Sequence, residues 1–317
     1  MALLAGVQER LQQRLDPLRA WLFPRRVFLQ LDDQAITLIA LDGQSLQWSE
    51  RVPLPAGLCE NGEAVRVDAL GDLLGDLMVE RGFAGAHADA VLPPVASQWR
   101  LVQWPEARWP DDRQQTLALH EQDLGLKTAL QYLDLHLLDL ERQPPTSLLI
   151  ATASTLLDRW LDVFSLAGVS LDRLEAADLC VCRGVQQLLR HDPTLDPPSC
   201  VVLLHLQSDR TALMVLEHGV PVYARRLPAA DASGALPREL QRWLEFWQTL
   251  HPGRAGSPLL VLHGSALTDR AEASQLMQGI PCAWRCLDPL ALGWWVPQSA
   301  DPPIAGPSLA ALWGLAA

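Results

Sequence analysis

The hydrophobic and polar positions of the chain form one pattern that occurs twice. The first copy, over residues 27–43, consists of a strand, a polar turn and a second strand, and a strand-like stretch follows it to residue 54. The second copy covers residues 201–227 and has a short turn at His218 and Gly219. Alternating apolar positions bounded by glycine and polar residues are typical of strands. The repeat predicts a duplicated α/β core with a cleft between its two halves.

The remaining periodicity predicts helices and short strands distributed along the rest of the chain, as in an α/β protein. Apolar side chains three and four residues apart predict helices over 1–26, 68–82, 111–125, 156–167, 176–189, 236–250 and 308–315. Short apolar runs that end at glycine, proline or polar residues predict strands over 88–92, 99–102, 132–140, 147–153, 171–174 and 259–264. The proline-rich segment 191–198 is the expected domain boundary.

The helix predicted over residues 1–26 carries a leucine-rich stripe opposite a polar face. Pro17 would kink this helix, and Pro24 would end it. Arginines close to Trp21 and Phe23 suit a lipid interface, so contact with a membrane surface is one interpretation. Packing of the stripe on the folded domain is the other, and it is the commoner role of such a stripe.

Composition narrows the possible functions. The chain has 317 residues, 49% hydrophobic and 20% charged, which is typical of a soluble globular protein of about two domains. A net charge of −12 argues against general binding to nucleic acid, because phosphate contacts need clustered lysine and arginine. Lys127 is the only lysine, so any kinase-like phosphate-binding lysine has to be this residue. No window reaches the ~18 apolar residues of a membrane span, so we expect only peripheral contact with a membrane.

The six cysteines do not form a metal-binding pattern. One Cys-x-Cys and one Cys-x3-Cys spacing occur without a histidine cluster at ligand spacing. We therefore expect buried free thiols, and the absence of a signal peptide predicts a reducing, cytosolic compartment. The cysteines are Cys59, Cys180, Cys182, Cys200, Cys282 and Cys286.

The order of these elements resembles the PilM family, the cytoplasmic actin-like proteins of the type IV pilus assembly machinery. The similarity covers nearly all of residues 27–317 and rests on a succession of modest motifs. In chain order these are Gly62–Asp68, Ala90–Pro93, Leu101–Pro105, Ala167–Glu175, Gly219–Arg225 and the tail Gly314–Ala317. The resemblance implies an actin-like, ribonuclease H-like α/β fold: a duplicated core with an inserted subdomain and a cleft between two lobes. It assigns 27–198 to the first lobe, with the insertion at about 91–165, and 199–317 to the second lobe, with a terminal helix that returns to the first.

Active members of the actin-like superfamily carry Asp-Ile-Gly at each polar turn. The Asp helps to organise magnesium, and the Gly lets backbone N–H groups approach phosphate. Here the turns are Gln30-Leu31-Asp32 and His205-Leu206-Gln207, so both key residues are absent from each turn. Asp32 and Asp33 would place negative charge where nucleotide phosphates would lie.

Other positions of the expected cleft also differ from an active site. The family's lysine after the first turn corresponds to Thr37, and of the adenosine-side glycine pair only Gly264 remains. An alternative polar network of Asp209, Arg210 and Thr211 would lack the glycines or repeated N–H donors of a phosphate cradle. We therefore expect a degenerate nucleotide cleft without a cofactor, and ATP with magnesium is the disfavoured alternative. For His205, a hydrogen-bonded structural role is the simpler interpretation.

The resemblance further implies a partner, the N-terminal cytoplasmic peptide of a PilN-like inner-membrane protein. The peptide would lie in a groove between the inserted subdomain and the first lobe. The apolar side chains expected there are Leu92, Val95, Trp99, Leu101 and Trp104. The implied protein is a pseudo-ATPase scaffold, peripheral at the inner face of the cytoplasmic membrane. It would also contact pilus platform proteins and serve a process such as twitching motility or competence.

Three alternatives remain open from the sequence. One is an active ATPase or sugar-kinase-like enzyme with an atypical site, although Walker, Gly-x-Gly-x-x-Gly and Gly-x-Ser-x-Gly motifs are absent. A second is a type II secretion platform component, a relative that normally continues into a membrane span. The third is a cell-division or shape filament protein, for which the altered phosphate turns are again a difficulty.

Overall fold

The computed structural model of the chain describes residues 26–104, 117–118, 121–125, 127–139, 146–192, 200–229, 234–250, 257–298 and 304–317. The helix predicted over 1–26 lies outside these ranges, apart from its last residue. Most of the helix predicted over 111–125 and of the proline-rich boundary at 191–198 also lies outside them. Within the described residues, Glu121–Leu124 (α4) is helical.

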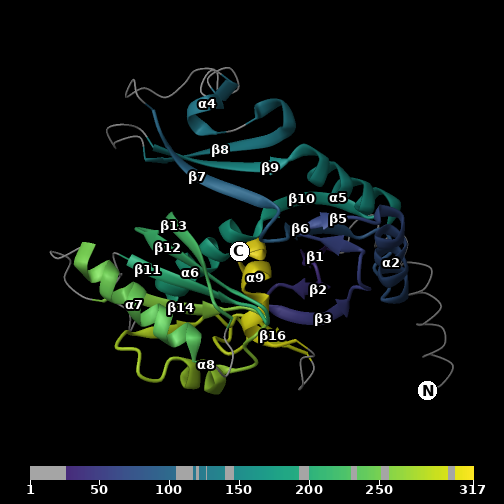
Figure 1. Ribbon diagram of the computed structural model, residues 1–317. Coiled ribbons are helices and arrows are strands. Elements are labelled where there is room, and N and C mark those ends of the chain that lie inside the picture. Colours follow the sequence, from purple (N-terminus) through teal and green to yellow (C-terminus); the bar gives the residue numbers. More distant parts are fainter. Residues whose placement is uncertain are drawn as a thin grey trace, which may run out of the picture.

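The first lobe is built on a six-stranded sheet with the order β10-β6-β1-β2-β3-β16 (Figure 1). β1, β2 and β3 form an antiparallel meander, and β6 and β10 continue the sheet in parallel from β1. The strands are β1 (Arg26–Leu31), β2 (Ala35–Asp42), β3 (Ser45–Pro53), β6 (His87–Leu92), β10 (Ser170–Ala176) and β16 (Val296–Pro297). The first copy of the repeated sequence pattern therefore forms the meander of this sheet.

The second lobe is built on a five-stranded sheet with the order β13-β12-β11-β14-β15. Its meander and its two parallel strands match β3-β2-β1-β6-β10 position by position. The strands are β11 (Cys200–Leu206), β12 (Thr211–Glu217), β13 (Val220–Leu227), β14 (Leu259–His263) and β15 (Trp284–Cys286). The shared order confirms the predicted duplication. The short β15 and β16 had no counterpart in the sequence prediction, because two or three residues are too few to show a period.

Helices cover both faces of each sheet. On the outer faces, α2 (Val67–Glu80) and α5 (Ser154–Leu166) pack on the first sheet, and α7 (Ala235–Leu250) and α8 (Arg270–Leu276) pack on the second. Between the lobes lie α6 (Ala177–His191), the short 3-10 helix η2 (Gly306–Leu309) and α9 (Ala310–Ala316) (Figure 1). Successive strand residues point to opposite faces. Leu29 therefore faces α2 and α5, whereas Phe28 joins the core between the lobes.

A separate three-stranded sheet, which we call the inserted sheet, lies between β6 and β10 in the sequence. Its antiparallel order is β7-β9-β8, and a small core of its own includes Val102, Trp104 and Leu149. The strands are β7 (Ser97–Gln103), β8 (Gln131–Asp139) and β9 (Thr146–Ala153). The hairpin of β4 (Cys59–Glu60) and β5 (Glu63–Ala64) and the 3-10 turn η1 (Thr128–Leu130) complete the described elements.

α9 crosses α6 at two glycines. A Cβ atom on Gly314 would lie 1.6 Å from the carbonyl oxygen of Cys180, a distance that no real side chain can adopt. A Cβ atom on Gly184 would lie 3.3 Å from the side chain of Leu287 and 3.4 Å from the carbonyl oxygen of Ala310. Only glycine permits this approach at position 314. The first residue of the tail motif therefore allows the close packing of α9 on α6.

Two arginines hold the C-terminal end of α9. Arg183 Nε donates to the carbonyl oxygen of Gly314 at 2.8 Å, and Arg173 Nη2 donates to that of Leu315 at 2.9 Å. Arg173 Nη2 also donates to the buried carboxylate of Asp89 at 2.8 Å. Cations at the carbonyl end of a helix satisfy free acceptors and complement the helix dipole. The end of the chain is thus fixed to β10 and α6, which precede the second sheet in the sequence.

The close crossing predicts a graded loss of stability. We expect Gly314→Ala to lower the free energy of unfolding by at least about 1–3 kcal/mol, because the new methyl group displaces α9 from α6. Gly184→Ala should cost less, since its nearest neighbours leave more room. Urea denaturation, monitored by circular dichroism, measures the free energy of unfolding of both variants. If Gly314→Ala unfolds at the same urea concentration as the wild type, the close crossing of α9 and α6 is wrong.

Candidate functional site

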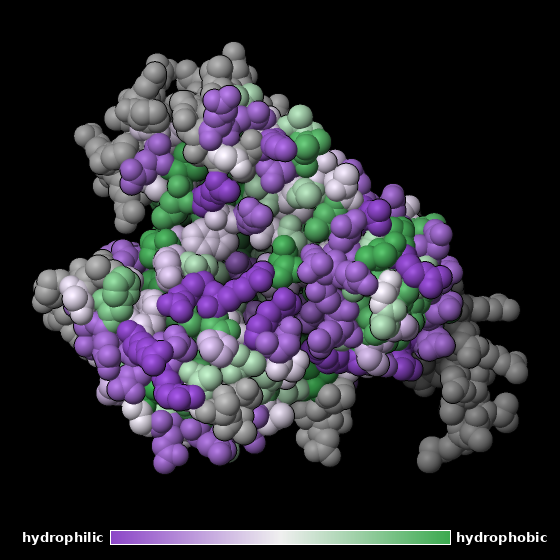
Figure 2. Space-filling model, in the orientation of Figure 1, coloured by the Kyte–Doolittle hydropathy of each residue, from purple (hydrophilic) through white to green (hydrophobic). Residues whose placement is uncertain are grey.

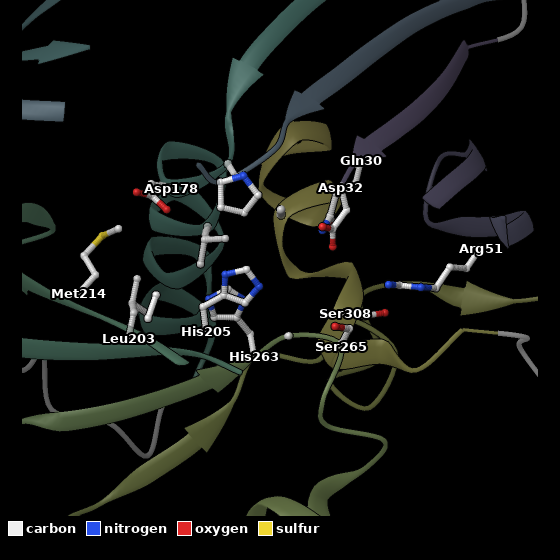
Figure 3. Close-up of a pocket in the computed structure, with 16 residues that line it drawn as sticks. Gln30, Asp32, Arg51, Asp178, Leu203, His205, Met214, His263, Ser265 and Ser308 are labelled. Atoms are coloured by element: carbon white, nitrogen blue, oxygen red, sulfur yellow. The ribbon is translucent and has the colours of Figure 1, made fainter. Parts of the chain in front are cut away.

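A small cavity lies between the lobes, at the place where the two polar turns and the end of β14 meet (Figure 3). Its volume is about 40 Å³. Among its lining residues are Gln30, Asp32 and Arg51 from the first lobe, Asp178 from α6, His205, Met214, His263, Gly264 and Ser265 from the second lobe, and Ser308 and Ala311 from η2 and α9. Small-molecule sites usually occupy on the order of 300–1,000 Å³, whereas one water needs roughly 10–15 Å³. The cavity has room for a few waters and not for a nucleotide.

Two stacked histidines occupy the second-lobe side of this cavity. His205 and His263 lie opposite each other on β11 and β14, with ring centroids 4.6 Å apart (Figure 3). Burial, assisted by the charge of Arg210, lowers the pKa of His205 to about 4. Burial and the neighbouring His205 lower the pKa of His263 well below its ordinary value. Both rings are therefore neutral near pH 7, and they present uncharged aromatic surface at the second turn.

The first polar turn brings Gln30 and Asp32 to the cavity but not Asp33. Asp33 Oδ1 accepts a hydrogen bond from the N–H of Gly62 at 2.6 Å and one from the thiol of Cys59 at 3.3 Å. Its carboxylate thus holds the β4–β5 hairpin, and the prediction that it faces the cleft is wrong. Asp32 does face the cavity, and burial raises the pKa of its carboxyl.

The second polar turn is closed by its own groups. The N–H of Gln207 donates to the carbonyl oxygen of Arg210 at 2.9 Å, and Arg210 Nε donates back to Gln207 Oε1 at 2.6 Å. Thr211 is fully buried at the start of β12. Neither Gln207 nor Thr211 lines the cavity, which corrects the predicted cleft. Asp209 Oδ1 lies 3.9 Å from Arg210 Nε. The polar groups of this turn therefore interact with one another rather than with the cavity.

Gly264 lines the cavity as predicted, but its position is required by packing. A Cβ atom there would lie 2.2 Å from the carbonyl oxygen of Leu206, and the φ angle of +121° is one that favours glycine. Its N–H donates to the carbonyl oxygen of Pro307 at 2.9 Å, in the segment that leads into α9. The backbone donor that would bind a ligand in a nucleotide site is therefore already used within the chain.

Asp178 also lines the cavity, and it was not predicted from the sequence. It lies in the first turn of α6 and accepts a hydrogen bond from Trp99 Nε1 of the inserted sheet at 3.1 Å. Burial raises the pKa of this carboxyl to about 6, and the bond from Trp99 opposes the rise. In the sequence, an acidic residue at a helix start is an ordinary exposed feature. Only the packing of β7 against α6 makes it a part-buried group.

A second cavity, which we call the insert groove, has a volume of about 880 Å³. It lies between the inserted sheet and the lobes, where Figure 2 shows a hollow below the upper part of the molecule. β8 and β9 form one wall, α6 and the end of β10 form the floor, and the turn at His218 and Gly219 forms the other wall. Its lining residues include Leu92, Tyr132, Asp134, His136, Leu138, Leu148, Ile150, Leu157, Glu175, Leu179, Arg183 and Gln186.

The five residues predicted for a peptide groove have different surroundings. Leu92 lines the insert groove. Trp99 and Leu101 pair with Ile150 and Leu148 across β7 and β9, so they belong to the sheet face that borders the groove. Trp104 does not, because it is buried in the separate core of the inserted sheet and donates to Ser147 Oγ at 2.6 Å.

Val95 also lies away from the groove lining. A Cβ atom on Gly62 would be 2.9 Å from its side chain, so Val95 packs beside the β4–β5 hairpin. The two misplacements have different causes. Side chains alternate between the faces of a strand, so Trp104 faces the core of the inserted sheet, whereas Trp99 and Leu101 share the opposite face. Val95 lies in the turn before β7, where strand alternation does not apply.

The side chains of the described ranges offer no site for a metal ion. No group of three or more histidine, cysteine or carboxylate side chains among them is arranged to hold a metal ion. All six cysteines are free thiols, as predicted, and four of them are buried. Of the helices that the structure describes, none has the length and apolar character needed to cross a bilayer.

Comparison with known proteins identifies the fold. No family model and no curated protein matches the sequence. A chain of the PilM–PilN type IV pilus biogenesis complex is similar over 92% of this chain and 97% of its own length, with 18% identity and a TM-score of 0.71. The ethanolamine utilization protein EutJ from Carboxydothermus hydrogenoformans is similar over 92% of this chain and 89% of its own, with 10% identity and a TM-score of 0.50. The predicted actin-like fold, with its resemblance to PilM, is confirmed at the level of structure.

The buried histidine pair predicts acid sensitivity. The unfolded chain protonates His205 near pH 6.5 and the folded chain only near pH 4, so the free energy of unfolding falls as the pH drops through this interval. For His205 the loss at about pH 4.5 is on the order of 2 kcal/mol. Urea denaturation at about pH 7.5 and 4.5 should show a smaller loss for His205→Gln than for the wild type. His136→Gln, at an exposed position, is the control and should follow the wild type. The same pH dependence in His205→Gln would contradict the neutral pair.

Proposed function

We propose that the chain is a non-catalytic scaffold of a type IV pilus assembly machinery. In this proposal it binds the N-terminal cytoplasmic peptide of a PilN-like membrane protein. The observation that carries the proposal is the insert groove, which lies between the inserted sheet and the lobes. The fold similarity to a chain of the PilM–PilN complex, over nearly the whole length of both chains, supports the same assignment.

The insert groove has the properties that an extended peptide requires. Its volume of about 880 Å³ lies in the usual range of ligand sites. Leu138, Ile150 and Leu179 offer partly exposed apolar surface to alternate side chains of a bound peptide. Asp134 adds a carboxylate that would attract a basic residue or a free amino group, and this charge would fix the direction of the peptide. Glu175 is already paired with Arg183.

The cleft between the lobes supports a role without ATP hydrolysis. Its cavity of about 40 Å³ is far smaller than a nucleotide site, and the N–H of Gly264 already donates to Pro307. The carboxylate of Asp32 would oppose phosphate, and the second turn offers the neutral ring of His205 instead of a magnesium ligand. To bind Mg-ATP, the lobes would have to separate, and Asp32 and His205 would have to be replaced by residues that bind phosphate and magnesium.

Within this proposal, the chain works at the cytoplasmic face of the inner membrane. A PilN-like partner, itself in the membrane, would hold it there, and pilus platform proteins would be further partners. The pilus would then serve twitching motility or competence. Because the chain would not hydrolyse ATP, its contribution to assembly would be to hold its partners in fixed positions.

Peptide binding is tested by fluorescence anisotropy. The probe is a labelled synthetic peptide that matches the N-terminus of the PilN-like protein of the same organism. We expect Ile150→Asp and Leu179→Asp each to weaken binding at least about tenfold, because each places a carboxylate on the apolar lining.

The matched control for peptide binding is Leu292→Asp, which makes the same kind of change at an exposed leucine that does not line the groove. It should bind as the wild type does. Circular dichroism establishes that all three variants are folded. Unchanged affinity in both groove variants, or no binding by the wild type, would refute the groove assignment.

Nucleotide binding is tested by calorimetry with Mg-ATP. We expect no binding of the wild type tighter than about millimolar, because the cavity is small and its backbone donor is used. Gly264→Ala is unsuitable as a control because its Cβ atom would clash with Leu206. Ser265→Trp is the better variant, since Ser265 is exposed at the cavity. Micromolar binding that this variant abolishes would overturn the non-catalytic proposal.

A further inference from the structure

The outer face of the first lobe carries a row of unpaired carboxylates. Asp68, Asp72, Asp76 and Glu80 recur every fourth residue along α2, and all four are exposed. None of them forms a salt bridge or a side-chain hydrogen bond within the described part of the chain, and the last turn of α2 contains no basic residue. Like charges at this spacing, and acidic groups at a helix C-terminus, both destabilise an isolated helix. A cationic neighbour would remove this repulsion.

Exposed apolar side chains lie beside this row. Val79 of α2 is 66% exposed, and Leu166 of α5 is 55% exposed. α2 and α5 pack closely at Leu166, since a Cβ atom on Gly71 would lie 2.6 Å from the Cβ atom of Leu166. Val79 lies about two helical turns further along α2. Exposed valine and leucine next to carboxylates suit a basic amphipathic helix. We call this surface the α2–α5 face, and it comprises Asp68, Asp72, Asp76, Val79, Glu80 and Leu166.

The chain enters the described fold at one end of the α2–α5 face. Arg26, the first residue of β1, pairs in register with His87 at the start of β6, and β6 begins shortly after α2 ends. Ser170, shortly after the end of α5, pairs with the same His87. The start of β1 and the C-terminal ends of α2 and α5 therefore lie at the same edge of the sheet. Residues 1–25 are tethered there.

Residues 1–25 have the complementary chemistry. They contain four arginines and two acidic residues, a net charge of +2, whereas the whole chain has a net charge of −12. The part before Pro17 carries the leucine-rich stripe, and its Arg10 and Arg14 have the four-residue spacing of the α2 carboxylates. A helix over 3–16 would have 14 residues, the same number as α2, and would therefore be equally long.

We propose that residues 1–25 cover the α2–α5 face of their own chain. The leucine-rich stripe packs on Val79 and Leu166, and the arginines lie along the row of carboxylates. The tether makes this contact intramolecular, which raises the effective concentration of the segment at the face. A membrane with anionic lipids is the less suitable occupant, because the carboxylates of α2 beside the point of attachment would repel it. The proposal does not depend on the proposed pilus function.

Hydrogen exchange of the full chain tests this contact. We expect amides of residues 3–16 to exchange at least about tenfold more slowly than in the isolated synthetic peptide 1–25. The double variant Arg10→Glu with Arg14→Glu, and the double variant Asp72→Arg with Asp76→Arg, should each lose this protection. The variant that combines all four changes should regain it, because opposite charges then face each other again.

A charge-matched control variant and a lipid-binding measurement complete the test. Asp42→Arg with Glu245→Arg changes the same number of charges at exposed positions of other elements, and it should keep the protection. The wild type should not co-sediment with vesicles of phosphatidylglycerol and phosphatidylcholine. Three results would each overturn the proposal: no protection in the lipid-free wild type, protection only with vesicles, or no recovery in the combined variant.

Discussion

The close crossing of α6 and α9 is the constraint on which the arrangement of this molecule depends. At Gly314 the backbone of α9 approaches the carbonyl oxygen of Cys180 to a distance that excludes any side chain. Arg183 and Arg173 then hold the carbonyl end of α9. Because α6 and α9 contribute to the core between the two sheets, this crossing sets how far apart the lobes lie. A wider crossing would move Ser308 and Ala311 away from His205 and His263 and would enlarge the cavity.

The two cavities of the protein share one helix. The first turn of α6 carries Asp178 beside the small cavity and against Trp99 of the inserted sheet. Further along the same helix, Arg183 lies in the floor of the insert groove and bonds both Glu175 and the end of α9. A partner that competes for Arg183 in the groove would therefore act on the helix that separates the lobes. In this fold one helix therefore borders both the groove and the cleft.

Much of the fold, though less of the site, could be predicted from the sequence. The duplicated meander and helices such as α2, α5 and α7 were predicted, because their apolar runs and regular spacing can be recognised whichever apolar residues form them. For the same reason a chain with only 18% identity shares the fold over 92% of this length. In the cleft, Gln30, Asp32, His205 and Gly264 were placed correctly, because they end buried strands that meet at one edge. Asp33 was misplaced, since its carboxylate turns to the N–H of Gly62, which is distant in the sequence.

By itself the sequence determined the repeat, the residues at its two polar turns and the chemistry available at the cleft. These follow from local patterns and from the types of side chain at neighbouring positions. Only the tertiary structure decided the size of the cleft, the burial of Asp178 and the face of β7 that borders the groove. Each of these depends on how two distant segments pack, which is set by side-chain volume and close backbone approach between elements. Gly314 shows the difference: in the sequence it is one small residue in a tail motif, and in the fold it determines how closely two helices meet.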